Sequence, residues 1–115
     1  MSIVYSDNAI LINATGGPQT SGAYDISKRQ QITLQFISTG TATFTVDESN
    51  DGTNWITGVS YLDAKATTGG GTFVTSSVVS TPTQQGAIIT PGFRYIRVNV
   101  TPAGGNATCI LQNGG

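Results

Sequence analysis

Alternation of apolar and polar residues with a period of two runs through the chain, and it predicts β-strands rather than helices. In the segment 31–37, isoleucine, leucine and phenylalanine alternate with threonine and glutamine, and the segment 41–47 repeats the pattern. The link between them, residues 38–40, is short and ends in a glycine, which is typical of a β-hairpin. The two segments are therefore expected to be neighbouring strands with one apolar face each.

The same alternation predicts further short strands towards both ends of the chain. They cover residues 10–12, 24–26, 55–61, 73–79, 87–90, 93–101 and 107–112. About eight short strands, separated by turn signals every roughly 8–12 residues, are typical of a β-sandwich. The fold expected is all-β, a single antiparallel β-sandwich of the jelly-roll or immunoglobulin-like kind, with a closed barrel as the alternative. The inner face is expected to collect Leu34, Phe36, Phe44, Val46, Trp55, Ile96 and Val98.

The chain length fits one domain, residues 1–115, because domains of roughly 100–150 residues are the commonest size. Residues 1–12 are expected to be an N-terminal arm or an edge strand. Residues 64–72 and 80–86 are rich in threonine, glycine, glutamine and proline, so they are expected to be loops.

Only 10% of the residues are charged and the formal net charge is −1, so copies of the chain repel one another weakly. This composition permits close assembly and argues against nucleic-acid binding, which requires a basic surface. The first residues lack both a basic region and a long apolar run, so no signal peptide is expected. No stretch approaches the ~18 apolar residues of a membrane span, so no membrane partner is expected and synthesis in a cytoplasm is predicted.

Histidine is absent, and with it the commonest general base and metal ligand. Cys109 is the only cysteine, so it has no disulfide partner in the chain, and a buried apolar position is expected for it. Asp47 and Glu48 are adjacent on a strand, which directs their side chains to opposite faces. No catalytic, cofactor-binding or metal-ligating residues are assigned, and no enzymatic activity is expected.

One acidic motif matches the first half of a calcium loop. Residues 47–52 place oxygen-bearing side chains at the first, third and fifth positions and glycine at the sixth. The twelfth position, where a calcium loop has a bidentate glutamate, is Gly58, and the flanking segments are strand-like. A tight turn capped by Asn50 and Asp51 explains the same residues and is the preferred interpretation.

Two groups of aromatic residues are candidate binding surfaces. Residues 93–97 interleave aromatic and basic side chains, as single-stranded nucleic-acid platforms do. An arginine packed over an aromatic ring on the outside of a sheet explains this pattern more simply. Trp55 and Tyr61 share one face of the segment 55–61 and could stack on a sugar, although a core position for Trp55 is preferred.

Two stretches resemble segments of small structural proteins of tailed bacteriophages. The first, residues 41–55, leads from a strand into the turn sequence SNDGTNW, and the second, residues 91–101, contains the strand sequence RYIRV. Proteins of this kind serve as capsid decoration proteins, head fibres and tail components. The resemblance implies a β-sandwich with a structural role in a phage particle.

The expected function is that of a non-enzymatic virion structural protein, in the first place a capsid decoration or cement protein on the outside of a phage head. Its location is then the virion, after synthesis in the host cytoplasm. The expected partners are the major capsid protein or other virion proteins, and further copies of the chain, with a trimer as the expected oligomer. Contacts are expected through residues 2–12 and 64–72. The alternative is a carbohydrate-binding or host-adhesion module that uses Trp55 or Tyr61.

Overall fold

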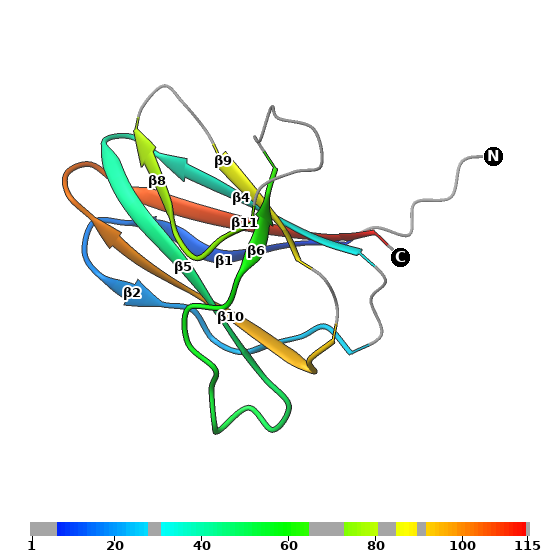
Figure 1. The fold of residues 1–115 in the computed structure, drawn as a ribbon. Helices are drawn as coiled ribbons and strands as arrows, with labels where there is room; N and C mark the ends of the chain where they lie inside the picture. The colour runs from blue at the N-terminus through cyan, green and yellow to red at the C-terminus, as the bar shows by residue number, and fades with distance from the viewer. Residues whose placement is uncertain (1–6, 28–30, 65–72, 81–84, 90–91, 115) are drawn as a thin grey trace.

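The computed structural model describes residues 7–27, 31–64, 73–80, 85–89 and 92–114, which form β-strands joined by turns (Figure 1). Six strands form one sheet, sheet A, and five form a second, sheet B. In chain order the strands are β1 (Asp7–Thr15), β2 (Gln19–Thr20), β3 (Tyr24–Asp25), β4 (Gln31–Ser38), β5 (Thr41–Ser49), β6 (Tyr61–Asp63), β7 (Phe73–Val74), β8 (Ser77–Ser80), β9 (Gln85–Ile89), β10 (Tyr95–Pro102) and β11 (Ala107–Gly114). Among the described residues, no helix is long and apolar enough to cross a membrane.

The strands pair as one long hairpin folded over on itself. β1 pairs with β11, β2 and β3 pair with β10, β4 pairs with β9, and β5 pairs with β8, all antiparallel. Successive pairs alternate between the sheets, so that sheet A has the order β1-β11-β4-β9 and sheet B the order β2-β10-β5-β8. This is a jelly roll, and β6 and β7 extend sheet A beyond β9. The predicted sandwich is confirmed, and the sheets are not closed into a barrel.

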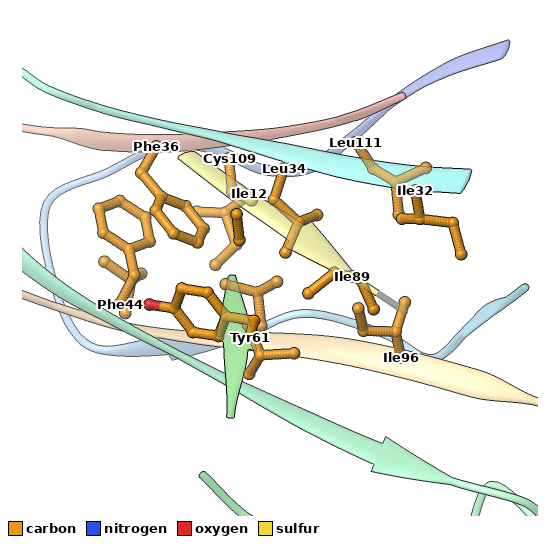
Figure 2. Packing of buried hydrophobic residues seen from close by; sticks show 14 of the residues in the cluster. Ile12, Ile32, Leu34, Phe36, Phe44, Tyr61, Ile89, Ile96, Cys109 and Leu111 are labelled. Carbon is orange, nitrogen blue, oxygen red and sulfur yellow. The ribbon is translucent and has the colours of Figure 1, made fainter. Parts of the chain in front are cut away.

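The core fills the space between the two sheets (Figure 2). Phe36 of β4 stacks on Phe44 of β5, with the ring centroids 4.5 Å apart, and Tyr61 meets Phe36 edge-on at 6.2 Å. Rings from both sheets therefore meet at the centre of the sandwich. Of the predicted inner-face residues, six are confirmed as fully or almost fully buried: Leu34, Phe36, Phe44, Val46, Ile96 and Val98.

The predicted strand over residues 55–61, with Trp55 on the inner face, is wrong. β6 begins only at Tyr61, and Ile56 forms an isolated bridge with Glu48 of β5. After the turn that follows β5, the chain runs back beside the end of that strand, where the amide of Val59 donates to Val46 O at 2.9 Å. Trp55 therefore lies on the outer face of sheet B, against a side chain of β10. Tyr61, where the chain joins sheet A, takes the core position.

The predicted hairpin around residues 38–40 is also wrong, because this link carries the chain from β4 in sheet A to β5 in sheet B. It passes beside the link between β10 and β11, which crosses between the same two sheets. A Cβ on Gly40 would lie 2.2 Å from Gly104 O, so the two backbones touch. The amide of Thr39 donates to Asn106 O at 2.9 Å, and the amide of Asn106 donates to Thr39 Oγ1 at 2.7 Å.

The other predicted segments have different outcomes. The run 73–79 divides into β7, in sheet A, and β8, in sheet B. Of the predicted loops, residues 65–72 and 81–84 lie outside the described part of the chain, whereas Gln85 and Gly86 belong to β9. Residues 1–6 also lie outside it, and β1, which starts at Asp7, forms one edge of sheet A.

Candidate functional site

Polar and aromatic side chains gather on the outer face of sheet B, where β5 and β10 lie side by side. We call this group the Trp55 cluster, and it consists of Asp47, Trp55, Arg97 and Asn99. Arg97 and Asn99 face outward because they alternate along β10 with the buried residues of the core. Asp47 lies directly opposite Arg97 in the ladder between the two strands. Strand alternation thus brings three polar side chains to one place on the surface.

Asp47 is the centre of the cluster. Its Oδ2 accepts hydrogen bonds from Arg97 Nε at 2.8 Å and from Asn99 Nδ2 at 2.9 Å, and its Oδ1 accepts the amide of Gly58 at 3.1 Å. Burial acts to raise the pKa of Asp47, but the hydrogen bonds from Asn99 and Arg97 outweigh it and hold that pKa below its ordinary value. The carboxylate is therefore charged at neutral pH and fixes both strand β10 and the returning segment.

Trp55 forms the aromatic side of the cluster. The guanidinium carbon of Arg97 lies 4.3 Å from the centre of the Trp55 ring, which is a cation–π contact. Asn99, the next outward-facing residue of β10 after Arg97, makes two further hydrogen bonds. Its Nδ2 also donates to Thr45 Oγ1 at 3.2 Å, and its Oδ1 accepts from Thr20 Oγ1 at 2.7 Å. A row of polar groups therefore crosses β2, β10 and β5 and ends at a half-buried indole ring.

The turn after β5 places Trp55 over the sheet. Asp51 Oδ1 accepts the amides of Thr53 at 2.9 Å and Asn54 at 2.8 Å, and Asn54 Nδ2 donates to Asp51 Oδ2 at 2.8 Å. The hydrogen bonds from Asn54 hold the pKa of Asp51 well below its ordinary value. Gly52 has a φ of +74°, a conformation that glycine adopts at little cost. Side chain and backbone together reverse the chain direction within six residues, 49–54.

The candidate calcium ligands do not converge on one point. Asp47 is bound to Arg97 on the sheet face, whereas Asp51 is bound to the amides of its own turn. In the part of the chain that the structure describes, no three acidic or cysteine side chains lie close enough to hold a metal ion. The carboxylates of the motif act here as a turn cap and as the anchor of the Trp55 cluster.

The two aromatic candidates are separated by the fold. Tyr61 is buried, with its hydroxyl hydrogen-bonded to Ser77 Oγ, and burial raises the pKa of Tyr61. A shared sugar platform of Trp55 and Tyr61 is therefore excluded. Within residues 93–97, Arg94 packs over the ring of Tyr95 at 5.2 Å and Arg97 packs over Trp55, as the simpler interpretation of that segment predicts.

Glu48 differs sharply from its neighbour Asp47. It lies opposite the buried Ile96 in the ladder, so it points to the core side of sheet B, and 7% of the residue is exposed. Its Oε2 is buried and has no hydrogen-bond partner. Desolvation by burial raises the pKa of Glu48 above its ordinary value. A charged carboxylate at this position therefore opposes folding.

We expect Glu48→Gln to stabilise the protein at neutral pH. Between the pKa of glutamate in the unfolded chain, about 4.3, and the raised pKa of Glu48 in the folded protein, the unfolded chain has lost the proton that the folded chain still holds. Wild-type stability therefore falls as pH rises through this interval and stays lowered above it. Relative to wild type, the variant should gain stability as the pH is raised above about 4, reaching about 1–3 kcal/mol once Glu48 is ionised in the folded protein, as measured by urea denaturation.

Asp25→Asn is the control for that experiment. Asp25 is exposed, and hydrogen bonds from Ser27 lower its pKa, so its removal should change the pH profile in the opposite sense. An unchanged pH profile in Glu48→Gln would mean that Glu48 is solvated in the folded protein.

Part of this site can be predicted from the alternation of apolar and polar residues. Asp47 and Arg97 were both recognisable as outward positions of alternating strands, but their pairing requires β5 to lie beside β10, which alternation does not specify. The core position predicted for Trp55 is wrong because residues 55–61 do not form one strand. The turn capped by Asp51 was the available signal that the chain reverses immediately before Trp55.

No protein-family model matches the chain, and a comparison with curated proteins finds no relative. Solved structures do share its fold. The SPBc2 prophage-derived protein YomS superposes with a TM-score of 0.78 over 98% of this chain and 96% of YomS, at 10% sequence identity. The PBSX exported protein XepA superposes with a TM-score of 0.60 over 95% of this chain, at 12% identity, and the chain spans 36% of XepA. The likeness at these identities is one of fold.

Proposed function

We propose that this chain is a non-enzymatic structural protein of a bacteriophage particle, and within that class a decoration protein that binds the outside of the head. The observation that carries the proposal is the jelly-roll sandwich that it shares, over nearly the whole of both chains, with the prophage-derived YomS. The resemblance of residues 41–55 and 91–101 to phage structural proteins supports the same conclusion from the sequence.

The outer face of sheet B suits burial against another protein. Its strands present threonine side chains, among them Thr43 and Thr45 of β5, and the ionic groups of the Trp55 cluster are paired with each other. A charge buried in an interface without a partner opposes binding, whereas a paired one does so much less. This face can therefore be covered by a capsid protein without leaving the charge of Asp47 or Arg97 unpaired.

Decoration of a shell is a multivalent process. Each copy of a small domain buries a modest interface, and many copies bridge neighbouring subunits of the major capsid protein, so the assembled coat is held far more strongly than one copy. Other copies of the chain would contribute further contacts. The contacts expected in residues 64–72 lie mostly outside the described part of the chain, so sheet B carries the proposal.

We expect the purified protein to sediment with undecorated phage shells and to saturate them at a fixed number of copies per capsid subunit. Thr43→Lys, which places a charge on the outer face of sheet B, should reduce the bound amount by about tenfold or more. Gln112→Lys, at an exposed position of β11 in sheet A, is the matched control and should bind as wild type does. Wild-type protein that stays in the supernatant would contradict the decoration role.

A carbohydrate-binding or host-adhesion role is the second candidate, and Trp55 is the observation that favours it. The indole ring lies on a sheet face beside hydrogen-bonding side chains, an arrangement that can hold a sugar by stacking and polar contacts. Trp55 is the only tryptophan, so a change in intrinsic fluorescence on adding host polysaccharide reports this site alone. Such a change, together with no binding to shells, would favour adhesion over decoration.

A further inference from the structure

β1 ends sheet A with an unpaired side. It pairs with β11 on one side, and among the described strands none pairs with the other (Figure 1). A free edge presents backbone N–H and C=O groups to other chains, and natural proteins usually protect it with lysine, proline or β-bulges. The sequence of β1, DNAILINAT, contains neither lysine nor proline. Of these three features, only β-bulges are left to protect the described part of this edge.

The backbone protects only the second half of β1. Register shifts fall between Ile10 and Ile12 and between Ile12 and Thr15, and Ala14 has a φ of +51°. Such bulges bend a strand and interrupt the row of groups that could pair with a neighbour. Residues 7–10, by contrast, keep a continuous register with β11. These four residues are the part of the edge that can accept another strand.

An exposed apolar side chain lies at the end of this regular stretch. Ile10 is 60% exposed and stands on the outer face of sheet A, opposite the half-buried Ile110 of β11. A strand added beside residues 7–10 would cover part of Ile10, and the removal of apolar surface from water favours association. Backbone pairing and apolar burial therefore act at the same place.

We propose that residues 7–10 are a self-association site, at which β1 pairs antiparallel with β1 of a second copy and joins the two A sheets into one. The inference rests on the proposed assembly function and identifies one of its contacts. A second copy fits because a twofold axis brings together two identical edges of equal length. The stretch contains one charged residue, Asp7, in a chain of net charge −1, so repulsion between the copies is small.

The face of each residue restricts the register. Ile10 faces outward, whereas Ala9 lies opposite the buried Leu111 and faces the core side. In antiparallel strands, the side chains of two directly opposed residues lie on the same face of the sheet. If the cores of both copies are to lie on the same side of the joined sheet, a residue must therefore lie opposite the same residue of the second copy, with the twofold axis between them. Ala9 on the axis satisfies this condition, and the opposed pairs formed by residues 8–10 then lie before the bulge that follows Ile10. Ile10 then lies opposite Asn8 of the second copy.

This register predicts a specific cross-link. Opposed residues have Cβ atoms about 4.5–5.5 Å apart, within reach of a disulfide after small adjustment. Under mild oxidation, Ala9→Cys should give a covalent dimer. Native Cys109 should form no cross-link, because its thiol is buried and burial raises the pKa of Cys109 to about 12. Val78→Cys, 55% exposed on β8 at an edge of sheet B, is the control and should remain monomeric.

Light scattering on the uncross-linked protein gives the second measurement. With rising concentration, the mass of the wild type should approach twice 11.9 kDa, and Ile10→Lys should weaken self-association by about tenfold or more without altering the thermal midpoint. A wild type that stays monomeric, equal cross-linking in Val78→Cys, or a mass three times that of the chain would each overturn the proposal. A trimer would require β1 to pair with a different edge.

The outcome is separable from that of the proposed function. Self-association is measured without shells, and shell binding is measured by sedimentation. Protein that binds shells but gives no Ala9→Cys dimer on them would refute the β1 contact and leave the decoration role intact. An Ala9→Cys dimer, together with no binding to shells, would support the β1 contact and contradict the decoration role.

Discussion

Replacing Phe36 by alanine is expected to lower the free energy of unfolding by about 3–5 kcal/mol. Phe36 is fully buried, stacks on Phe44 at 4.5 Å with an interplanar angle of 14°, and meets the edge of Tyr61. Its removal takes away the ring that joins β4 to β5 across the two sheets, and the backbone on either side is too constrained to close the cavity. Domains of this size are stable by only about 5–15 kcal/mol, so the loss is a large fraction of the total.

Phe73→Ala is the matched control, since it removes the same side chain from a position that is 67% exposed. We expect its effect to stay within about 0.5 kcal/mol. Both variants can be compared by urea denaturation followed by circular dichroism. A Phe36→Ala variant as stable as Phe73→Ala would mean that the inter-sheet stack does not hold the sandwich together.

The second large effect is expected from Gly40→Ala, which should cost about 1–3 kcal/mol. A Cβ at this position would lie 2.2 Å from Gly104 O and 2.6 Å from Gly104 C. Both contacts are to backbone, so no side-chain rotation relieves them, and one of the two crossing links must move. Any such movement strains the hydrogen bonds between Thr39 and Asn106, which tie the links together.

Gly22→Ala provides the comparison. A Cβ on Gly22 would meet nothing within 4 Å, and this residue has no positive φ, so the variant is expected to be neutral or slightly stabilising. Thermal denaturation of both variants tests the argument, with the midpoint lowered only for Gly40→Ala. Equal midpoints would show that the two links can separate without cost.

The sequence allowed the faces of long strands to be predicted, because period-two alternation is a local property. Phe44 and Val46 on β5 and Ile96 and Val98 on β10 were assigned correctly to the core side. Alternation says nothing about which sheet a strand joins. The link at Gly40 was therefore predicted to be a hairpin. In the structure it crosses between the sheets and lies in close contact with Gly104, 64 residues later in the chain.

The candidate site was harder to predict because it combines three separate segments. Asp47 and Arg97 come from strands whose adjacency depends on the whole topology. Trp55 joins them only because the turn at Asp51 reverses the chain, and hydrogen bonds to the end of β5 then hold the returning segment beside that strand. Alternation predicted only that Asp47 and Glu48 point to opposite faces, and the lack of a hydrogen-bond donor for Glu48 Oε2 depends on neighbours that are distant in sequence.

The nested pairing of the strands also governs how the protein is made. β11 lies between β1 and β4, so β1 has no partner strand, and β4 has only β9, until residues 107–114 have left the ribosome. Until then sheet A is incomplete and the apolar face of β1 has no sheet to join, and folds that depend on such non-local pairing form slowly. Completion of sheet A must therefore follow the synthesis of residues 107–114. A chain that stops before residue 107 loses the strand that joins β1 to β4, and with it the continuity of sheet A.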